Sequence, residues 1–280
     1  MVSSRIVTKE KIKIQKVQNM TIRDFGNQWL LHGKLREDYW TSDEMFKDYL
    51  CNLIDPKIIT GSTVLEVGSG SGRILRMIDR YAPNRLIGVE PSKGFNNLHS
   101  NTVNVKNLEL LNIKGSDYNI ENIDIVFSLG VIHHIKSPQN TLRNIHSSLS
   151  SDGIFICWVY GMENNRIYVV VRKIISNITR ILPDESLDKI CNVLQFFIVR
   201  YGKFSVRYMR SRLPITKYIQ EVFAPCGELE RKYILFDQLN PAYAKYYTKR
   251  KFIKTLKKAG FTRIELAHRH GYSWTAAAYK

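Results

Sequence analysis

The chain has 280 residues, 44% of them hydrophobic and 24% charged, which is typical of a folded protein with one large domain and excludes a mainly disordered chain. It offers neither a secretory apolar run at its start nor the roughly 18 uncharged apolar residues of a membrane span, so we expect a cytoplasmic location. The net charge of +17 predicts an anionic partner, such as nucleic acid, an acidic membrane surface or a phosphorylated substrate.

Hydrophobic runs alternate with helix-like stretches between about residues 46 and 160, which predicts βαβ crossovers and a parallel sheet. After this region the rhythm stops, and the closing part of the chain holds a helix ended by Gly260 and two more strands. The predicted strands are 63–67, 85–89, 108–113, 123–128, 153–160, 262–268 and 272–279. The expected segments are a leading segment (1–45), an α/β core (46–160), a helical insertion (161–247) and a closing helix with a strand hairpin (248–280).

The stretch TVLEVGSGSG, residues 63–72, ends the first predicted strand in a glycine-rich turn. Such a turn lets a ligand approach the main chain, and places it at the amino end of a helix, where free N–H groups bind anions. The carboxylate of Glu66 would repel the phosphates of a dinucleotide but would attract a cation. A ligand with a carboxylate for the turn and an ammonium for Glu66 is an amino acid. If it also carries a nucleoside, Glu90 at the end of the second strand is placed for the ribose hydroxyls.

Four stretches, VLEVGSGSG, GVEP, GSD and SLGVIHHI, resemble in order the motifs of class I S-adenosylmethionine-dependent methyltransferases. The resemblance runs over about residues 45–160 and resumes over 250–280. It implies an α/β fold with a doubly wound, Rossmann-like methyltransferase sheet and a C-terminal antiparallel hairpin. In this chain a helical insertion follows the fifth strand. The implied activity is that of a methyltransferase with S-adenosyl-L-methionine as its cofactor.

The same resemblance assigns the cofactor contacts. Gly68 and Gly70 would face the methionine part, Glu66 its ammonium and Glu90 its ribose, and Asp117 would face the adenine amino group. For Asp117 a simple turn cap is an open alternative. The residues implied to form the cofactor site are Glu66, Gly68, Gly70, Gly72, Glu90, Asp117, Leu129 and Gly130.

Catalysis needs a base only if the acceptor is a hydroxyl, because the sulfonium is already activated and positioning supplies much of the rate. His133 is our candidate base, ahead of His134, since both follow the fourth strand at the edge where ligands of doubly wound folds bind. Tyr160, Glu163 and Asn164 leave the fifth strand at the same edge and form a second candidate group. The alternatives are structural packing of the two histidines and a helix cap by Glu163 or Asn164.

No metal site is expected, because no cluster of histidine and carboxylate residues has the spacing of metal ligands. The cysteines are far apart and are expected to be reduced thiols.

Three further stretches, DFGNQWLLHGKLREDYW, WVYGMENN and FDQLNPAYAKYYT, resemble a bacterial subgroup of these enzymes, some with polysaccharide-assembly functions. The resemblance implies that the leading segment folds over the cofactor, with Phe25, Trp29 and Trp40 as a lid that excludes water. The alternative is an amphipathic helix that packs on the sheet for stability.

The insertion concentrates positive charge, with ten Lys and Arg residues against four acids over residues 161–214. On a helix, Phe197, Tyr201, Phe204 and Tyr208 would lie along one side, and a basic stripe would lie about a quarter turn away. The stripe consists of Arg200, Lys203, Arg207 and Arg210. This layout is typical of an interfacial membrane helix, and equally of a helical cap with a solvated basic face.

We therefore expect a methyltransferase that acts on a small-molecule, sugar or lipid-linked acceptor, with oxygen as the expected methylated atom. The enzyme would lie in the cytoplasm, with peripheral contact at the inner face of the membrane. One alternative is an RNA methyltransferase, which the positive charge supports although we find no RNA-binding motif. The other is a catalytically silent cofactor-binding protein. Nucleic acid is the less expected partner.

Overall fold

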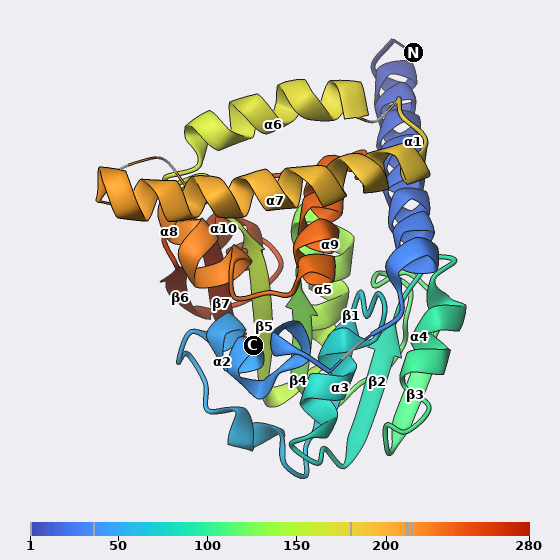
Figure 1. The fold of residues 1–280 in the computed structure, drawn as a ribbon. Coiled ribbons are helices and arrows are strands. Elements are labelled where there is room, and N and C mark those ends of the chain that lie inside the picture. The colour runs from blue at the N-terminus through green and yellow to red at the C-terminus, as the bar shows by residue number, and fades with distance from the viewer. Residues whose placement is uncertain (1, 36, 180, 211–212, 214) are drawn as a thin grey trace.

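A seven-stranded sheet forms the centre of this computed structural model, which describes residues 2–35, 37–179, 181–210, 213 and 215–280 (Figure 1). The strands are β1 (Thr63–Val67), β2 (Arg85–Val89), β3 (Leu108–Leu111), β4 (Ile123–Leu129), β5 (Leu149–Tyr160), β6 (Arg263–Arg269) and β7 (Ser273–Tyr279). They lie in the order β3-β2-β1-β4-β5-β7-β6, in which β1 to β5 pair in parallel and β7 runs antiparallel to β5 and β6. The predicted methyltransferase sheet with its C-terminal hairpin is confirmed.

The predicted strand limits agree with the structure to within two residues, except at the start of β5. The prediction began this strand at Gly153, where the apolar run starts, whereas β5 begins at Leu149. Leu149 is buried and pairs with Ile123, and the register shifts before Ile125 pairs with Ile154. A polar stretch is thus part of the strand because a buried residue holds its beginning in the sheet.

Two layers of helices cover the sheet. One face carries α5 (Gln139–Ser148) and α10 (Lys249–Lys257), whose side chains pack with Leu65 and Val67 of β1. The other face carries α2 (Asp43–Leu50), α3 (Arg73–Asp79) and α4 (Phe95–Asn101), which pack with Val64 and Phe127. Alternate residues of β1 therefore serve different faces, as expected for a strand buried on both sides.

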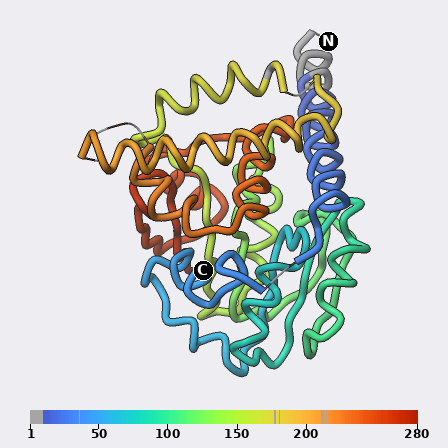
Figure 2. Tube along the Cα trace, viewed as in Figure 1, coloured from blue at the N-terminus to red at the C-terminus, as the bar shows by residue number. Residues whose placement is uncertain are grey.

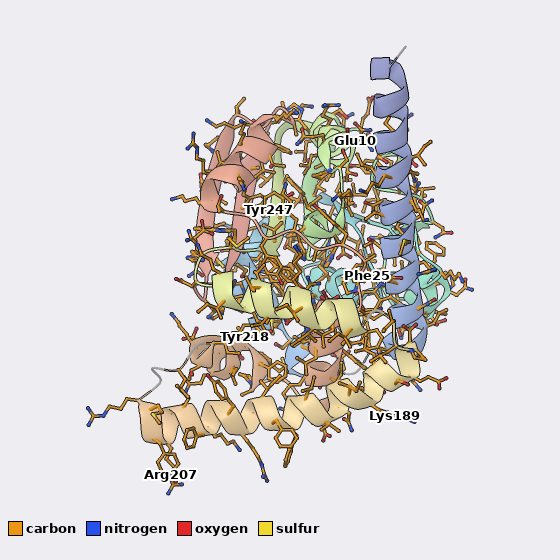
Figure 3. The ribbon with its side chains drawn as sticks, turned by 90° about the horizontal axis from the view of Figure 1, so that it is seen from above. Glu10, Phe25, Lys189, Arg207, Tyr218 and Tyr247 are labelled. Atoms are coloured by element: carbon orange, nitrogen blue, oxygen red, sulfur yellow. The ribbon has the colours of Figure 1, made fainter. Side chains whose placement is uncertain are left out.

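The insertion between β5 and α10 forms a helical cap, which we define as α6 (Arg166–Thr179), α7 (Asp184–Met209), α8 (Thr216–Tyr218), the short helix η4 (Ile219–Phe223) and α9 (Glu228–Leu239). A small apolar cluster that includes Leu187 and Phe236 holds α7 to α9. An isolated bridge between Gly161 and Tyr247 closes the base of the insertion. Seen from above, α6 and α7 run in roughly the same direction, with α6 nearer to the sheet (Figure 3). Arg180, Arg212 and Pro214, which belong to the basic insertion, lie outside the described residues.

The leading segment forms a long helix, α1 (Val2–His32), whose coloured part runs from the core past one end of α7 (Figure 2). Its C-terminal end is fixed on both sides. Trp29 accepts a hydrogen bond at its carbonyl from Asn97 (2.7 Å), and Asn27 donates to Asp184 of the cap (3.1 Å). Helix α1 therefore touches both the core and the cap. Within the described residues, no helix is both long and apolar enough to cross a membrane.

Candidate functional site

A cavity of about 1060 Å³ opens where the carboxyl ends of β1, β2 and β4 meet α1 and the cap. Small-molecule pockets usually measure roughly 300–1,000 Å³, so this one has room for a nucleoside-sized ligand and part of a second one. Its wall combines the glycine turn after β1 with side chains from the leading helix and from the helical cap. The cavity thus joins the predicted cofactor edge to residues that the sequence places in two other segments.

The glycine turn adopts a backbone that other residues tolerate poorly. Gly68, Gly70 and Gly72 have φ values of 84°, 55° and 88°, in the left-handed region that favours glycine. A Cβ atom at Gly70 would lie 3.0 Å from the ring of Trp29, so the turn also needs glycine for space. All three main-chain positions are therefore fixed by the local geometry.

Glu90 follows β2 and holds this turn in place. One carboxylate oxygen accepts a hydrogen bond from the Gly70 amide (2.9 Å), and the other accepts from the Ser92 amide (3.0 Å). The side chain is buried, which raises its pKa, and the hydrogen bonds from Ser92 and Gly70 oppose that shift. Glu90 thus lies in the cavity wall with fixed orientation, as a ribose-binding carboxylate requires.

Glu66 is the least satisfied carboxylate of the site. Only 1% of its surface is exposed, and its Oε2 atom has no hydrogen-bond partner among the described residues. Burial raises its pKa to about 8, against the opposing charge of Arg73. An unpaired acceptor in a cavity wall fits a ligand that brings a cation, such as the ammonium of S-adenosylmethionine.

Asp117, Leu129 and Gly130 also line the cavity, whereas Gly72 does not. Asp117 accepts a hydrogen bond from the neighbouring Ser116 hydroxyl (2.6 Å), and its own amide donates to the Lys114 carbonyl (2.9 Å). Its side chain therefore takes part in a turn and faces the ligand space as well. Leu129 ends β4, and Gly130 follows it with a φ of 88°. The roles of these residues toward the cofactor stay predictions.

The aromatic residues of the leading segment cover the cavity. Phe25, Trp29 and Trp40 all line it. The Phe25 ring lies 4.7 Å from the ring of His134, and the Arg73 guanidinium lies 4.4 Å from the Trp40 ring. The same side chains thus pack against the core, as in the stability alternative, and bound the ligand space.

The two histidines after β4 differ in their access to the cavity. His133 is fully buried and is not one of the lining residues, whereas His134 is. Burial lowers the pKa of both, that of His133 most strongly, with a further contribution from the charge of His134. The predicted base, His133, therefore lies behind its neighbour, although its role remains a prediction.

Of the residues predicted after β5, Tyr160 lines the cavity and Glu163 does not. The Tyr160 hydroxyl donates to Asp237 Oδ2 (2.8 Å) in the cavity wall. The carboxylate of Glu163 accepts from the Lys249 amide at the start of α10 and from Trp274 Nε1, each at 2.9 Å, and it does not line the cavity. Glu163 thus binds the first amide of α10, a helix far away in the sequence, rather than capping the helix that follows it.

Asp237 was missed by the sequence reasoning. It lies on α9, 77 residues after Tyr160, and no spacing in the sequence links the two. The only signal was its position in the stretch FDQLNPAYAKYYT, which carries the resemblance to the bacterial subgroup but gives no role to any single residue.

Comparison with known proteins agrees with this geometry. Residues 65–157 match the family model described as "Methyltransferase domain". An S-adenosylmethionine-dependent methyltransferase from Mesorhizobium loti has the same fold, with a TM-score of 0.50 at 12% identity over 85% of this chain and 98% of that one. Fold, domain and site together define a class I S-adenosylmethionine-dependent methyltransferase. The matched domain makes the protein a methyltransferase of this class, and its cofactor is S-adenosyl-L-methionine.

The curated relatives carry a more specific name. A "tRNA U34 carboxymethyltransferase" of Campylobacter lari is 27% identical over 140 residues, which cover 46% of this chain and 47% of the relative. A protein of the same name from Klebsiella pneumoniae strain 342 is 29% identical over 147 residues, with 50% and 43% coverage. The chain spans about half the length of the curated relatives it matches.

These names correct two predictions made from the sequence. We expected a small-molecule, sugar or lipid-linked acceptor and possible contact with an anionic membrane, with nucleic acid as the less expected partner. The expected acceptor and the low rank of nucleic acid are wrong by this comparison, because the matching relatives are named for tRNA, whereas these names do not test contact with a membrane. The error has a physical cause: a basic surface attracts phosphates of any origin, so charge alone does not separate RNA from lipid.

Proposed function

We propose that the protein is an RNA methyltransferase with tRNA as its substrate class. The observation that carries this proposal is the series of curated relatives named tRNA U34 carboxymethyltransferase, at 25–29% identity in Campylobacter, Desulfotalea, Alteromonas and Klebsiella. The cytoplasmic location is part of the same proposal. Which nucleotide accepts the group is left to the experiment.

The charge distribution supports an RNA partner. The basic stripe on α7 contains Arg200, Lys203, Arg207 and, at the helix end, Arg210, all with exposed side chains. No acidic residue follows Asp188 on this helix. Arg207 points away from the body of the molecule (Figure 3). Such a row of cations neutralises successive phosphates and releases their counterions, which favours binding to any polyanion.

Aromatic side chains accompany these cations. Phe197 and Tyr208 are 60% and 63% exposed, and the Arg200 guanidinium lies 4.1 Å from the ring of Phe196. Exposed rings beside cations form stacking platforms for unpaired bases, each worth about 1–3 kcal/mol. The combination is more specific to single-stranded RNA than charge alone.

The cavity supports the same proposal. A base must leave its stack before its atoms can be methylated, and it then needs a pocket that holds it beside the cofactor. The cavity reaches from Glu66 at the cofactor edge to Tyr160 and Asp237 under the cap. Its far end is walled by aromatic residues, among them Tyr168 and Tyr246, which suits a planar guest.

The test follows a labelled methyl group from S-adenosylmethionine into fractionated host extract. We expect label in the tRNA fraction. Label confined to lipid or to small soluble molecules would contradict the proposal.

RNA binding provides an independent measurement. Changing Arg200, Lys203 and Arg207 to Gln should lower tRNA affinity and reduce the slope of log affinity against log salt by about two, since each lost phosphate contact removes about 0.7–0.9. The matched control changes three exposed lysines at the end of α10, Lys254, Lys257 and the C-cap residue Lys258, to Gln. Equal losses in both triple variants would show that net charge, and not the α7 stripe, governs binding.

A further inference from the structure

We propose that His134 is the catalytic base of this methyltransferase, and that Tyr160 and Asp237 form the acceptor end of the cavity around it. The proposal deepens the proposed function and depends on it only in that the acceptor atom carries a proton. It differs from the assignment to His133 made from the sequence.

The hydrogen bond of His134 determines which ring nitrogen is the base. Nδ1 lies 2.8 Å from the carbonyl oxygen of Tyr243. A carbonyl only accepts, so Nδ1 carries the hydrogen of the neutral ring. Nε2 therefore keeps its lone pair. This Nε2 atom is buried and has no hydrogen-bond partner among the described residues. The residue is only 4% exposed, and it lines the cavity.

The segment that follows α9 holds the ring of His134 in position through main-chain atoms. His134 closes the short helix η3 (Ile132–His134) that directly follows β4. The amide of Lys245 donates to the carbonyl of His133 (2.9 Å), so the segment after α9 is attached to η3 by both a main-chain and a side-chain contact. The strand pairing brings Glu66 of β1 beside Phe127 of β4, and thus brings the cofactor edge next to η3.

The charges around His134 leave it neutral and prepare it to take a proton. The titratable groups that face it are His133, Tyr160, Arg172 of α6 and Asp237 of α9. Burial lowers its pKa, with help from Arg172, whereas Asp237 and the Tyr243 carbonyl favour the protonated ring. A neutral imidazole is thus ready to accept, and the Asp237 carboxylate stabilises the cation that forms.

Tyr160 and Asp237 are less suited than His134 to accept the proton of the acceptor, because they are hydrogen-bonded to each other. The Tyr160 hydroxyl already donates to Asp237, and burial together with this carboxylate raises its pKa well above the usual value. Asp237 in turn has Oδ2 occupied by Tyr160. We assign both as positioning residues that orient the acceptor and support the charge on His134.

Bound S-adenosylmethionine supplies an activated methyl group. The acceptor atom forms a bond to that carbon while its own proton passes to His134 Nε2. The sulfur–carbon bond breaks and its electron pair stays on sulfur, which cancels the sulfonium charge. The resulting imidazolium then releases the proton to solvent, which restores the neutral ring.

His133 is the natural comparison, because it is the adjacent residue and the same type of side chain. It is fully buried, lies 4.2 Å from His134 between ring centroids, and does not line the cavity. A change there disturbs packing without removing a group that faces the acceptor.

The experiment compares His134→Gln with His133→Gln, using whichever acceptor fraction takes up the label. We expect His134→Gln to lower kcat by about 10²- to 10⁴-fold and to lose the acidic limb of the pH profile, the usual cost of removing a general base. Cofactor and acceptor affinities should stay near those of the native protein. Asp237→Asn should keep this limb but shift it to lower pH, because the anion that favours the imidazolium is gone.

A spectroscopic measurement makes the test independent of turnover. A long-range ¹H–¹⁵N spectrum of the native protein, assigned with His134→Gln, should show the ring of His134 as the Nδ1–H tautomer. The opposite tautomer, an unchanged acidic limb in His134→Gln, or loss of that limb in His133→Gln would each overturn the proposal. Label outside RNA would overturn the proposed function and leave the test of His134 intact.

Discussion

The cofactor edge and the helical cap differ in which side chains they bury and which they expose. At the cofactor edge, polar groups are buried and held by the main chain, as when Glu90 binds the amides of Gly70 and Ser92. In the cap, large apolar side chains remain exposed, and Ile167 and Ile178 of α6 are 73% and 60% exposed. The family model also ends at residue 157, before the cap begins. One region thus buries polar groups in fixed positions, as expected for a ligand site, whereas the other leaves apolar side chains exposed, as expected for a surface that contacts a partner.

Removal of Glu90 is the most severe change to the cofactor edge. Glu90→Ala removes a carboxylate expected to bind two ribose hydroxyls, at about 1.5 kcal/mol or more for each charge-assisted hydrogen bond, so cofactor affinity should fall about a hundredfold. Calorimetric titration with S-adenosylmethionine measures the change. Glu109→Ala is the matched control, because this carboxylate lies on β3 in an exposed pair with Arg85. Native affinity in Glu90→Ala would refute the assignment of the ribose site.

The pKa of Glu66 predicts the next largest effect. Because this pKa is about 8, the free protein carries Glu66 protonated near neutral pH, whereas an ammonium ligand needs the carboxylate. Binding therefore releases a proton, and affinity should rise about tenfold between about pH 6 and pH 7, where an α-amino group with a pKa of about 7.7–8.0 stays largely charged.

Calorimetry in two buffers with different ionisation enthalpies measures the proton released. Glu66→Gln should bind with little dependence on pH in this range, since the amide does not titrate. A native protein whose affinity is the same at both pH values would show that Glu66 does not pair with the ligand's cation.

Gly70→Ala should weaken cofactor binding about fivefold, an effect of about 1 kcal/mol, because the new methyl group meets the Trp29 ring. Gly61→Ala is the control. Gly61 also has a positive φ, 74°, but open space around its Cβ position. Both variants should lose similar stability, about 1–2 kcal/mol from left-handed backbone strain. Equal cofactor affinity in the two would mean that Trp29 does not bound the site.

The smallest expected effect concerns the joint between core and cap. His270 lies in the turn between β6 and β7. Its Nε2 atom is 2.7 Å from Oδ1 of Asp48 on α2, and its Nδ1 atom is 2.6 Å from Oε2 of Glu221 on η4. The hydrogen bond and charge of Asp48, with help from Glu221, raise the pKa of His270 above 6.5, against the effect of burial. The stabilisation from its charged form is complete below pH 6.5 and is lost as pH rises through the raised pKa.

Thermal unfolding should therefore separate native protein from His270→Gln more at low than at high pH. His99→Gln is the control, since His99 is exposed on α4. A difference in melting temperature that stays constant with pH would show that the charge of His270 does not hold the cap.

Local patterns predicted the sheet, which is confirmed, and the structure brings the residues of the predicted cofactor edge together, although their roles toward the cofactor stay predictions. Glu66, the three glycines and Glu90 belong to two adjacent strand ends, and parallel strands bring such ends together. Asp237 was beyond this reasoning, since its contact with Tyr160 depends on how the cap folds back.

Two other assignments stay predictions, and they depend on local contacts that the sequence does not show. His133 and His134 have the same side chain, and only the turn of η3 decides which of them reaches the cavity. Glu163 follows a strand end like a catalytic residue, but the start of α10 lies near enough to take its carboxylate.

Helix α1 touches both halves of the cavity with residues one turn apart. Trp29 packs against the glycine turn, and Phe25 packs against His134. Any shift of this helix that accommodates one ligand moves the wall of the other ligand's space. We therefore expect cofactor and acceptor to bind with a shared coupling free energy, so that each changes the affinity of the other by the same factor.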